Sequence, residues 1–229
     1  MQVPLQQSKE PPYGGFNFGG KHMSSKAFFN EVANQWDEMR TSYFSSQVRE
    51  KAFDIAGLEA GKIAADIGAG TGFITEGLVT RGIKVVVVDQ SEEMIKSMQN
   101  KFASYPEIQY KLGNYDRLPI EDNKIDYVFA SMFLHHVEEP LVAIKEMVRV
   151  LKPGGKLVIA DAEEHPYEFL KTEHYDCWLG FKKSDLKEWL VSVALNNVTV
   201  KDLEERCTVP SKLTQEIADI NILVGYGEK

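Results

Sequence analysis

The chain has 229 residues, of which 26 are Lys or Arg and 34 are Asp or Glu, so its formal net charge is −8. At about 150 residues per domain, this length predicts one large domain with an appendage, with a core that needs no disulfides. No apolar run reaches the roughly 18–20 residues that span a bilayer, and no secretory signal opens the chain, so we expect a cytoplasmic protein with no membrane span. The acidic balance argues against a nucleic-acid partner and favours a small molecule. The oligomeric state is left open.

The N-terminal part of the chain divides into two segments. Residues 1–24 are rich in Gln, Pro and Gly and show no hydrophobic period, so we interpret them as a disordered tail or a leader added by cloning. Residues 25–57 form an expected helical cap, because apolar residues recur at three- and four-residue spacing from Phe28 to Met39. A further helix is expected over 46–56. The remainder, residues 58–229, is expected to be one sheet-centred domain.

Expected strands and helices alternate along that domain. The strands are 62–67, 83–89, 108–112, 125–130 and 156–161, and the intervening helices are 73–80, 91–102 and 141–150. A helix over 184–195 and strands over 198–203 and 219–224 follow. This alternation predicts right-handed βαβ crossovers and therefore an α/β, Rossmann-like, doubly wound sheet. The central strands are continuously apolar, as expected when helices cover both faces.

The strongest chemical signal is a glycine loop between the first strand and its helix, Asp66-Ile67-Gly68-Ala69-Gly70-Thr71-Gly72. Glycines there let a ligand approach the backbone closely, and Asp89 at the end of the next strand can accept both hydroxyls of a ribose. The spacing matches neither the dinucleotide motif nor the triphosphate loop. An acid at Asp66 would repel a pyrophosphate but suits a cation, which favours S-adenosylmethionine. A turn that merely needs glycine is the alternative.

These motifs are joined by others in order along the chain: Gly113-Asn114, Leu118-Pro119, Leu134-His135-His136 and Leu151-Lys152-Pro153-Gly154-Gly155. Together they resemble class I S-adenosylmethionine-dependent methyltransferases, most of all the small-molecule branch that includes the ubiquinone/menaquinone-biosynthesis enzymes. The resemblance runs from about Phe28 to Asp161. It implies a seven-stranded sheet whose last strand is antiparallel. It also implies an enzyme that transfers a methyl group to a small-molecule acceptor by in-line displacement and releases S-adenosylhomocysteine.

The resemblance further implies a cofactor-binding set spread over several loops. In it Asp89 holds the ribose, Met94 packs near the adenine, and Asn114 stands where relatives usually carry an Asp that bonds the adenine amino group. The other members are Asp66, Gly68, Ala69, Gly70, Gly72, Gln90, Tyr115, Ser131 and, from the helical cap, Trp36 and Arg40. For Trp36 the alternative is packing against the core, together with Phe29.

A catalytic base is optional for methyl transfer, because a thiolate, amine or carbanion acceptor needs none and a hydroxyl usually does. His135 and His136 follow the fourth strand at the rim of the crevice and are the candidate catalytic residues. Packing or capping of the local turn is their alternative role. The fifth strand is followed in the sequence by Asp161, Glu163, Glu164 and His165, whose spacing matches no metal-ligand motif. We therefore predict a solvated loop there and no metal.

Residues 165–182 are the expected substrate lid, because this segment is dense in aromatics that shield a flat or apolar acceptor. The candidate substrate contacts are His165, His174, Tyr175 and Trp178; an amphipathic helix packed on the core is the alternative. Cys177 and Cys207 form no Cys-x-x-Cys pair, which disfavours a redox or zinc role. Arsenite methyltransferases share the scaffold but depend on additional cysteines, so that substrate is disfavoured.

Two other functions stay open at this point. One is a non-catalytic module that binds S-adenosylmethionine for regulation, since no unmistakable base is present. The other is a protein or RNA methyltransferase. The acidic balance speaks against RNA, and Ala130-Ser131-Met132-Phe133 stands after the fourth strand in place of the Asn-Pro-Pro-Tyr type of motif.

Overall fold

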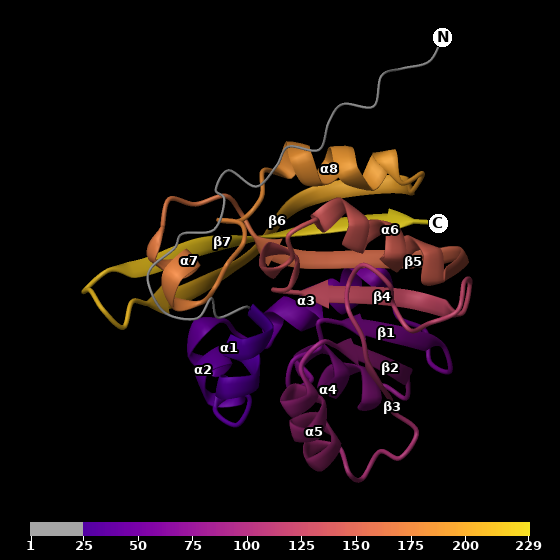
Figure 1. The fold of residues 1–229 in the computed structure, drawn as a ribbon. Coiled ribbons are helices and arrows are strands. Elements are labelled where there is room, and N and C mark those ends of the chain that lie inside the picture. The colour runs from indigo at the N-terminus through magenta and orange to yellow at the C-terminus, as the bar shows by residue number, and fades with distance from the viewer. Residues whose placement is uncertain (1–24) are drawn as a thin grey trace.

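A single mixed sheet of seven strands organises the computed structural model, which describes residues 25–229. The tail expected over 1–24 lies outside the described residues. The strand order is β3-β2-β1-β4-β5-β7-β6 (Figure 1). The parallel strands are β1 (Ile63–Ile67), β2 (Lys84–Asp89), β3 (Gln109–Leu112), β4 (Ile125–Ser131) and β5 (Leu151–Ala162). The last strand, β7 (Ile217–Glu228), runs antiparallel to β5 and to β6 (Asn196–Pro210), so the expected topology is confirmed.

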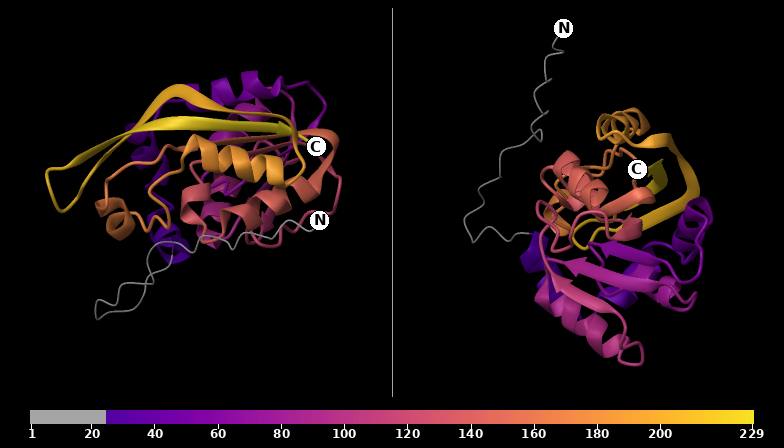
Figure 2. Two further views of the ribbon diagram at one scale, coloured as in Figure 1. Left: turned by 90° about the horizontal axis from the view of Figure 1, so that it is seen from above. Right: turned by 90° about the vertical axis from the view of Figure 1, so that its right-hand side faces the viewer.

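Helices cover both faces of the sheet (Figure 2). On one face the core includes residues of α3 (Gln47–Ala56), α4 (Phe73–Val79) and α5 (Glu92–Lys101), and on the other it includes residues of α6 (Pro140–Val150) and α8 (Lys183–Ser192). Strand β2 shows why a continuous apolar run is needed. Its residues Val85 and Val87 belong to the first core, while Val86 and Val88 belong to the second. Successive side chains of a strand point to opposite faces, so each face requires its own apolar residues.

Local signals place most helix ends where the sequence predicts them. The hydroxyl oxygen of Ser91 accepts a hydrogen bond from the backbone N–H of Met94 at 3.1 Å, which caps α5. Helix α6 ends at Val150, before Pro153. The single helical pattern expected from residue 25 is divided in the structure into α1 (Ser25–Val32) and α2 (Trp36–Tyr43).

The last two strands are much longer than the sequence predicts. Strand β7 alternates buried and exposed residues over its first half, because one side of the β6–β7 hairpin faces solvent there. A prediction that follows continuous apolar runs therefore stops too early. The Arg206 guanidinium also pairs with Asp219 across the hairpin at 2.5 Å. The hairpin extends beyond the rest of the sheet (Figure 1).

The first two helices, α1 and α2, lie at the carboxyl ends of the parallel strands and are bonded to the loops there (Figure 1). Asp37 in α2 accepts hydrogen bonds from the Thr71 hydroxyl at 2.5 Å and from Lys101 Nζ at 2.8 Å. The Ser91 hydroxyl bonds Asn30 of α1 at 2.6 Å. Helices α1 and α2 are thus fastened to the glycine loop and to α5.

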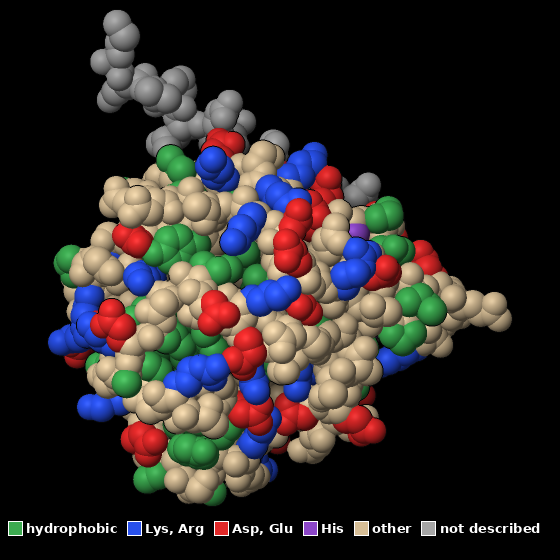
Figure 3. Space-filling model, turned by 180° about the vertical axis from the view of Figure 1, so that it is seen from behind, with side chains coloured by type: hydrophobic (Ala, Val, Ile, Leu, Met, Phe, Trp, Pro, Cys, Tyr) green, Lys and Arg blue, Asp and Glu red, His purple; other side chains and the backbone are tan. Residues whose placement is uncertain are grey.

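The surface carries charges of both signs. On the face seen in Figure 3, basic and acidic side chains are intermingled and form no single-signed field. Within residues 25–229, no helix is both long and apolar enough to cross a membrane. The cytoplasmic location and the absence of a nucleic-acid partner stay predictions.

Strand β7 offers a matched pair of isoleucines that tests the packing of the antiparallel edge. Ile222 is fully buried, whereas Ile217 is 58% exposed. Ile222→Ala should lower the free energy of unfolding by about 2–5 kcal/mol, because it removes buried methyl groups and leaves a cavity. Ile217→Ala should change it by less than about 0.5 kcal/mol. Urea unfolding followed by circular dichroism measures both, and equal losses would show that β7 is not packed as described.

Candidate active site

A cavity of about 710 Å³ opens at the carboxyl ends of the parallel strands. In open α/β sheets this edge is where ligands bind. Most of the predicted cofactor-binding residues line the cavity: Trp36, Arg40, Asp66, Gly68, Ala69, Gly70, Asp89, Gln90, Met94, Asn114, Tyr115 and Ser131. Gly72 does not line it. Gly72 is instead the N-cap of α4, and a Cβ on it would lie 2.5 Å from the Phe102 ring. The structure thus brings residues from five segments of the chain to one cavity.

The glycine loop is held in place by the neighbouring strand. Gly68 has a φ of +66°, and a Cβ on it would lie 2.0 Å from the Phe133 ring, so both its conformation and its surroundings favour glycine. The backbone N–H of Gly70 donates to Asp89 Oδ2 at 2.8 Å, and that of Ser91 donates to Oδ1 at 2.8 Å. The Asp89 carboxylate therefore joins the loop after β1 to the loop after β2.

The second acid of the cavity wall, Asp66, is 2% exposed. Its Oδ2 accepts hydrogen bonds from the backbone N–H of Thr75 at 3.0 Å and from the Thr75 hydroxyl at 2.7 Å. Burial raises the pKa of Asp66 to about 7, and the nearby charge of Asp89 adds to the rise, while both bonds from Thr75 oppose it. Near neutral pH a cation beside Asp66 would therefore favour its ionised form.

The two candidate catalytic histidines lie in the short 3-10 helix η1 (Leu134–His136) and have different surroundings. His135 Nδ1 lies 2.6 Å from Asp161 Oδ1, and Asp161 Oδ2 accepts the backbone N–H groups of Phe133 at 3.1 Å and Leu134 at 2.7 Å. Asp161 is fully buried. The expectation that Asp161 lies in a solvated loop is therefore wrong, because these donors hold its carboxylate inside the fold.

Buried charges set the protonation of this region. Burial opposes a charge on His135, yet the carboxylates of Asp161 and Asp176 outweigh it and raise the pKa of His135 to about 9. Burial, and then the charge of His135, hold the pKa of His136 well below its usual value. Burial also raises the pKa of Asp176 to about 7 and that of the Cys177 thiol to about 11. Cys177 is therefore a neutral thiol at pH 7 and not a ready nucleophile.

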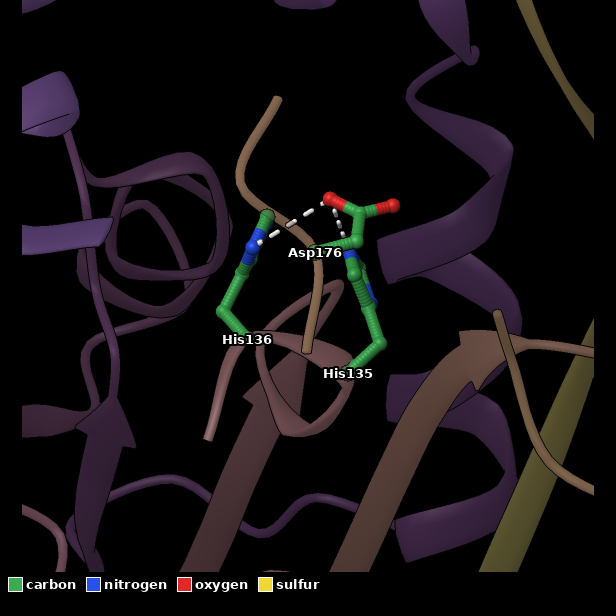
Figure 4. Close-up of side chains that lie close together, drawn as sticks. All are labelled: His135, His136 and Asp176. Carbon is green, nitrogen blue, oxygen red and sulfur yellow. Dashed lines mark ion pairs between the residues drawn. The ribbon is translucent and has the colours of Figure 1, made fainter. Parts of the chain in front are cut away.

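His136, Asp176 and Cys177 line the large cavity, whereas His135 lies behind it. Asp176 Oδ1 is 3.4 Å from His136 Nδ1 and 4.0 Å from His135 Nε2 (Figure 4). Asp176 was not among the residues singled out from the sequence. No spacing rule links it to the histidines, because the three residues come from segments about 40 positions apart; the only signal was its place in the aromatic-rich segment 165–182.

The four candidate substrate contacts are not placed together. Tyr175 lines the large cavity. His165 and His174 line a much smaller cavity that adjoins the large one, and burial lowers the pKa of each to about 4. Trp178 packs on Trp189 and donates its Nε1–H to the carbonyl of Val137 at 2.9 Å. Substrate contact by each of the four, and the lid itself, stay predictions.

Comparison with known proteins agrees with this geometry. Residues 65–159 match the family described as a methyltransferase domain. The demethylmenaquinone methyltransferase of Renibacterium salmoninarum is 36% identical over 143 residues, which are 61% of this chain and 59% of that protein. The chain thus spans less than two thirds of the length of this relative. The resemblance to class I S-adenosylmethionine-dependent methyltransferases is confirmed.

Solved structures support the same fold at low sequence identity. A SAM-dependent methyltransferase from Aquifex aeolicus superposes with a TM-score of 0.63 and 20% identity, covering 87% of this chain and 97% of its own. The [4+2]-cyclase SpnF superposes with a TM-score of 0.69 and 14% identity, covering 90% and 96%. At such identities the likeness shows the fold alone, and the cyclase shows that this fold hosts more than one chemistry.

The raised pKa of Asp66 predicts a pH-dependent stability. The folded state binds a proton at Asp66 up to about pH 7, whereas the unfolded chain releases it near the ordinary aspartate pKa of 3.8. The stability linked to this proton is therefore fully present below about pH 4 and is lost as the pH rises through about 7. Asp66→Asn, which stays neutral, should raise the melting temperature much more at pH 8 than at pH 5, because at pH 5 only part of this stability has been lost.

Thermal unfolding at both pH values measures this effect, with the exposed Asp54→Asn in α3 as the matched control. A melting temperature of Asp66→Asn that differs from the unsubstituted chain by the same amount at pH 5 and pH 8 would contradict the assignment.

Proposed function

We propose, on the premise that residues 65–159 are a methyltransferase domain of the class I fold, that this chain is an S-adenosylmethionine-dependent methyltransferase acting on a small molecule. The observation that carries the proposal is that two buried carboxylates, Asp66 and Asp89, line one cavity on either side of the glycine loop. One suits the positive charge of the methionine portion, and the other suits a ribose diol.

The cavity wall fits the cofactor part by part. Asp66 would hold its cationic end, Asp89 the ribose, and Met94 and Asn114 the adenine. Arg40 offers the opposite charge for the carboxylate of the methionine portion; its guanidinium carbon lies 4.6 Å from the centre of the Phe73 ring. Arg40 Nε and Ser131 Oγ are both buried without a partner among the described residues, and both belong to residues of the cavity wall. Such atoms favour a polar ligand, because an unpaired buried donor is costly.

Bound S-adenosylmethionine supplies a methyl group that is already activated by the positive sulfur. The chain's own task is then to hold the acceptor in line and to exclude water. Phe29 and Trp36 of the cap line the cavity. Their rings pack edge to face, with centroids 5.2 Å apart. We infer that helices α1 and α2 close the cavity over the cofactor.

The acceptor is proposed to be flat and largely apolar. The Phe, Trp and Tyr side chains of the cavity wall are Phe29, Trp36, Phe44, Phe73, Tyr115, Phe133 and Tyr175. The demethylmenaquinone methyltransferase relatives are consistent with an aromatic acceptor of this kind. Of the two candidate bases, His136 borders the cavity. We therefore propose that His136 contacts the acceptor and that His135 supports His136 from behind the cavity wall.

Cofactor binding is tested by calorimetry with S-adenosylmethionine and S-adenosylhomocysteine. The chain should bind both, and Asp89→Asn should weaken binding at least about tenfold, because a hydrogen bond to a charged group contributes roughly 1.5–3 kcal/mol. Asp54→Asn, an exposed aspartate of α3, is the control and should bind like the unsubstituted chain. No binding of either nucleoside by folded protein would sink the proposal.

Acceptor class is tested by incubating the chain with methyl-labelled cofactor. Label should enter a demethylated naphthoquinol and not a peptide mixture or RNA, because the acceptor region is enclosed and aromatic. Label in peptide or RNA would overturn the small-molecule proposal in favour of a macromolecular substrate. Cofactor binding without label in any acceptor from a metabolite extract would instead favour a regulatory module.

A further inference from the structure

Three potential metal-ligand atoms converge where η1 meets the segment that follows α7 (Phe169–Glu173). Among the described residues, His135, His136 and Asp176 form a group whose ligand atoms all lie within 4.8 Å of one another. One carboxylate oxygen of Asp176 faces a ring nitrogen of each histidine (Figure 4). We propose that these three side chains form a binding site for one divalent transition-metal ion.

Two of the three side chains present atoms that lack a hydrogen-bond partner among the described residues. His136 Nδ1 and Asp176 Oδ1 are buried and make no hydrogen bond within the described part of the chain. Their side chains are only 10% and 6% exposed. A buried polar atom left unpaired costs about 1–3 kcal/mol, so such atoms are rare unless a water or an ion satisfies them. A metal ion bound between them would satisfy both at once.

The third side chain, His135, is already oriented as a metal ligand. Its Nδ1 is bonded to Asp161, which leaves Nε2 as the atom that faces Asp176. The Asp161 carboxylate is in turn held by the backbone N–H groups of Phe133, Leu134 and Ala162. A carboxylate behind a histidine fixes the ring and its tautomer at many metal sites. Asp161 would therefore support the site without touching the ion.

The separations are close to those a metal requires. Asp176 Oδ1 lies 3.4 Å from His136 Nδ1 and 4.0 Å from His135 Nε2. Ligands about 2.0–2.2 Å from one ion lie roughly 3–3.5 Å apart, so small side-chain rotations bring all three atoms into contact with it. Two imidazole nitrogens and one carboxylate oxygen suit Zn²⁺, Fe²⁺ and similar ions, whereas Mg²⁺ and Ca²⁺ prefer oxygen ligands only.

The site borders the large cavity, because His136 and Asp176 both line it. The Cys177 thiol donates to the His136 carbonyl at 3.2 Å and is not counted as a ligand. With three protein ligands, a fourth coordination position is left for water or for an acceptor oxygen. Use of that position by an acceptor rests on the proposed function; binding of the ion does not.

Binding is measured on the full chain without an affinity tag, stripped with a chelator and then titrated with Zn²⁺ or Co²⁺. Calorimetry should show one ion per chain, and the visible spectrum of bound Co²⁺ should report nitrogen and oxygen ligation. His136→Gln and Asp176→Asn should each weaken affinity at least tenfold. Asp161→Asn should weaken it about 10- to 100-fold, as loss of a supporting carboxylate does elsewhere. Asp54→Asn, an exposed aspartate of α3 that lines neither cavity, is the control and should leave affinity unchanged.

Circular dichroism of each stripped variant separates loss of the site from loss of the fold, and the conservative Asp176→Asn keeps the test usable if a histidine variant unfolds. Absence of stoichiometric binding by the unsubstituted chain would overturn the proposal, and so would equal affinity in the His136→Gln, Asp176→Asn and Asp54→Asn variants. The cluster would then be a buried ion pair. S-adenosylmethionine is absent from these titrations, so their failure is distinct from a failure of the proposed function.

Discussion

Buried aspartates at the ends of three parallel strands determine the shape of the functional edge of this protein. Asp66 in β1, Asp89 in β2 and Asp161 in β5 are each less than 9% exposed. A buried carboxylate is costly unless hydrogen bonds compensate, and here each one accepts at least one backbone N–H group, from Thr75 of α4 for Asp66 and from the adjacent loops for Asp89 and Asp161. The same bonds that satisfy the charges hold the loops in place. The cavity therefore depends on where these three carboxylates lie.

The hydrogen bonds that offset the cost of burial differ among these carboxylates, and the difference has consequences for function. Asp89 receives N–H groups from two loops, whereas among the described residues Asp66 is bonded by Thr75 alone, on one of its oxygens. Burial raises the pKa of both carboxyls, that of Asp66 to about 7. Asp66 therefore lowers the stability of the folded chain at neutral pH unless a positive ligand is near. Such a trade of stability for binding is expected at a site built to hold a cation.

Asp161 plays the corresponding part on the other side of the cavity. By bonding both η1 and His135, it fixes the histidine pair against the end of β5. Asp176 then enters from a segment far along the chain and meets the same pair. Both the glycine-loop part of the cavity and the part near η1 are therefore organised in the same way, by a carboxylate at the end of a strand that bonds the adjacent segment. They differ in what faces the cavity: two carboxylates and backbone around the glycine loop, and the His136 imidazole with the Asp176 carboxylate near η1.

The order of elements and the glycine loop with its two acids could be predicted from the sequence alone, because each depends on neighbours in the chain. Apolar periodicity identifies strands and helices. The Asp66–Gly72 motif indicates a ligand-binding loop when a strand precedes it and a helix follows. The long hairpin of β6 and β7 could not be delimited in this way, since buried and exposed residues alternate in its outer part. Only the tertiary structure decided that Asp161 is buried and that Asp176 meets His135 and His136. These contacts join segments that are distant in sequence, and the burial that sets their charges exists only after the sheet has formed.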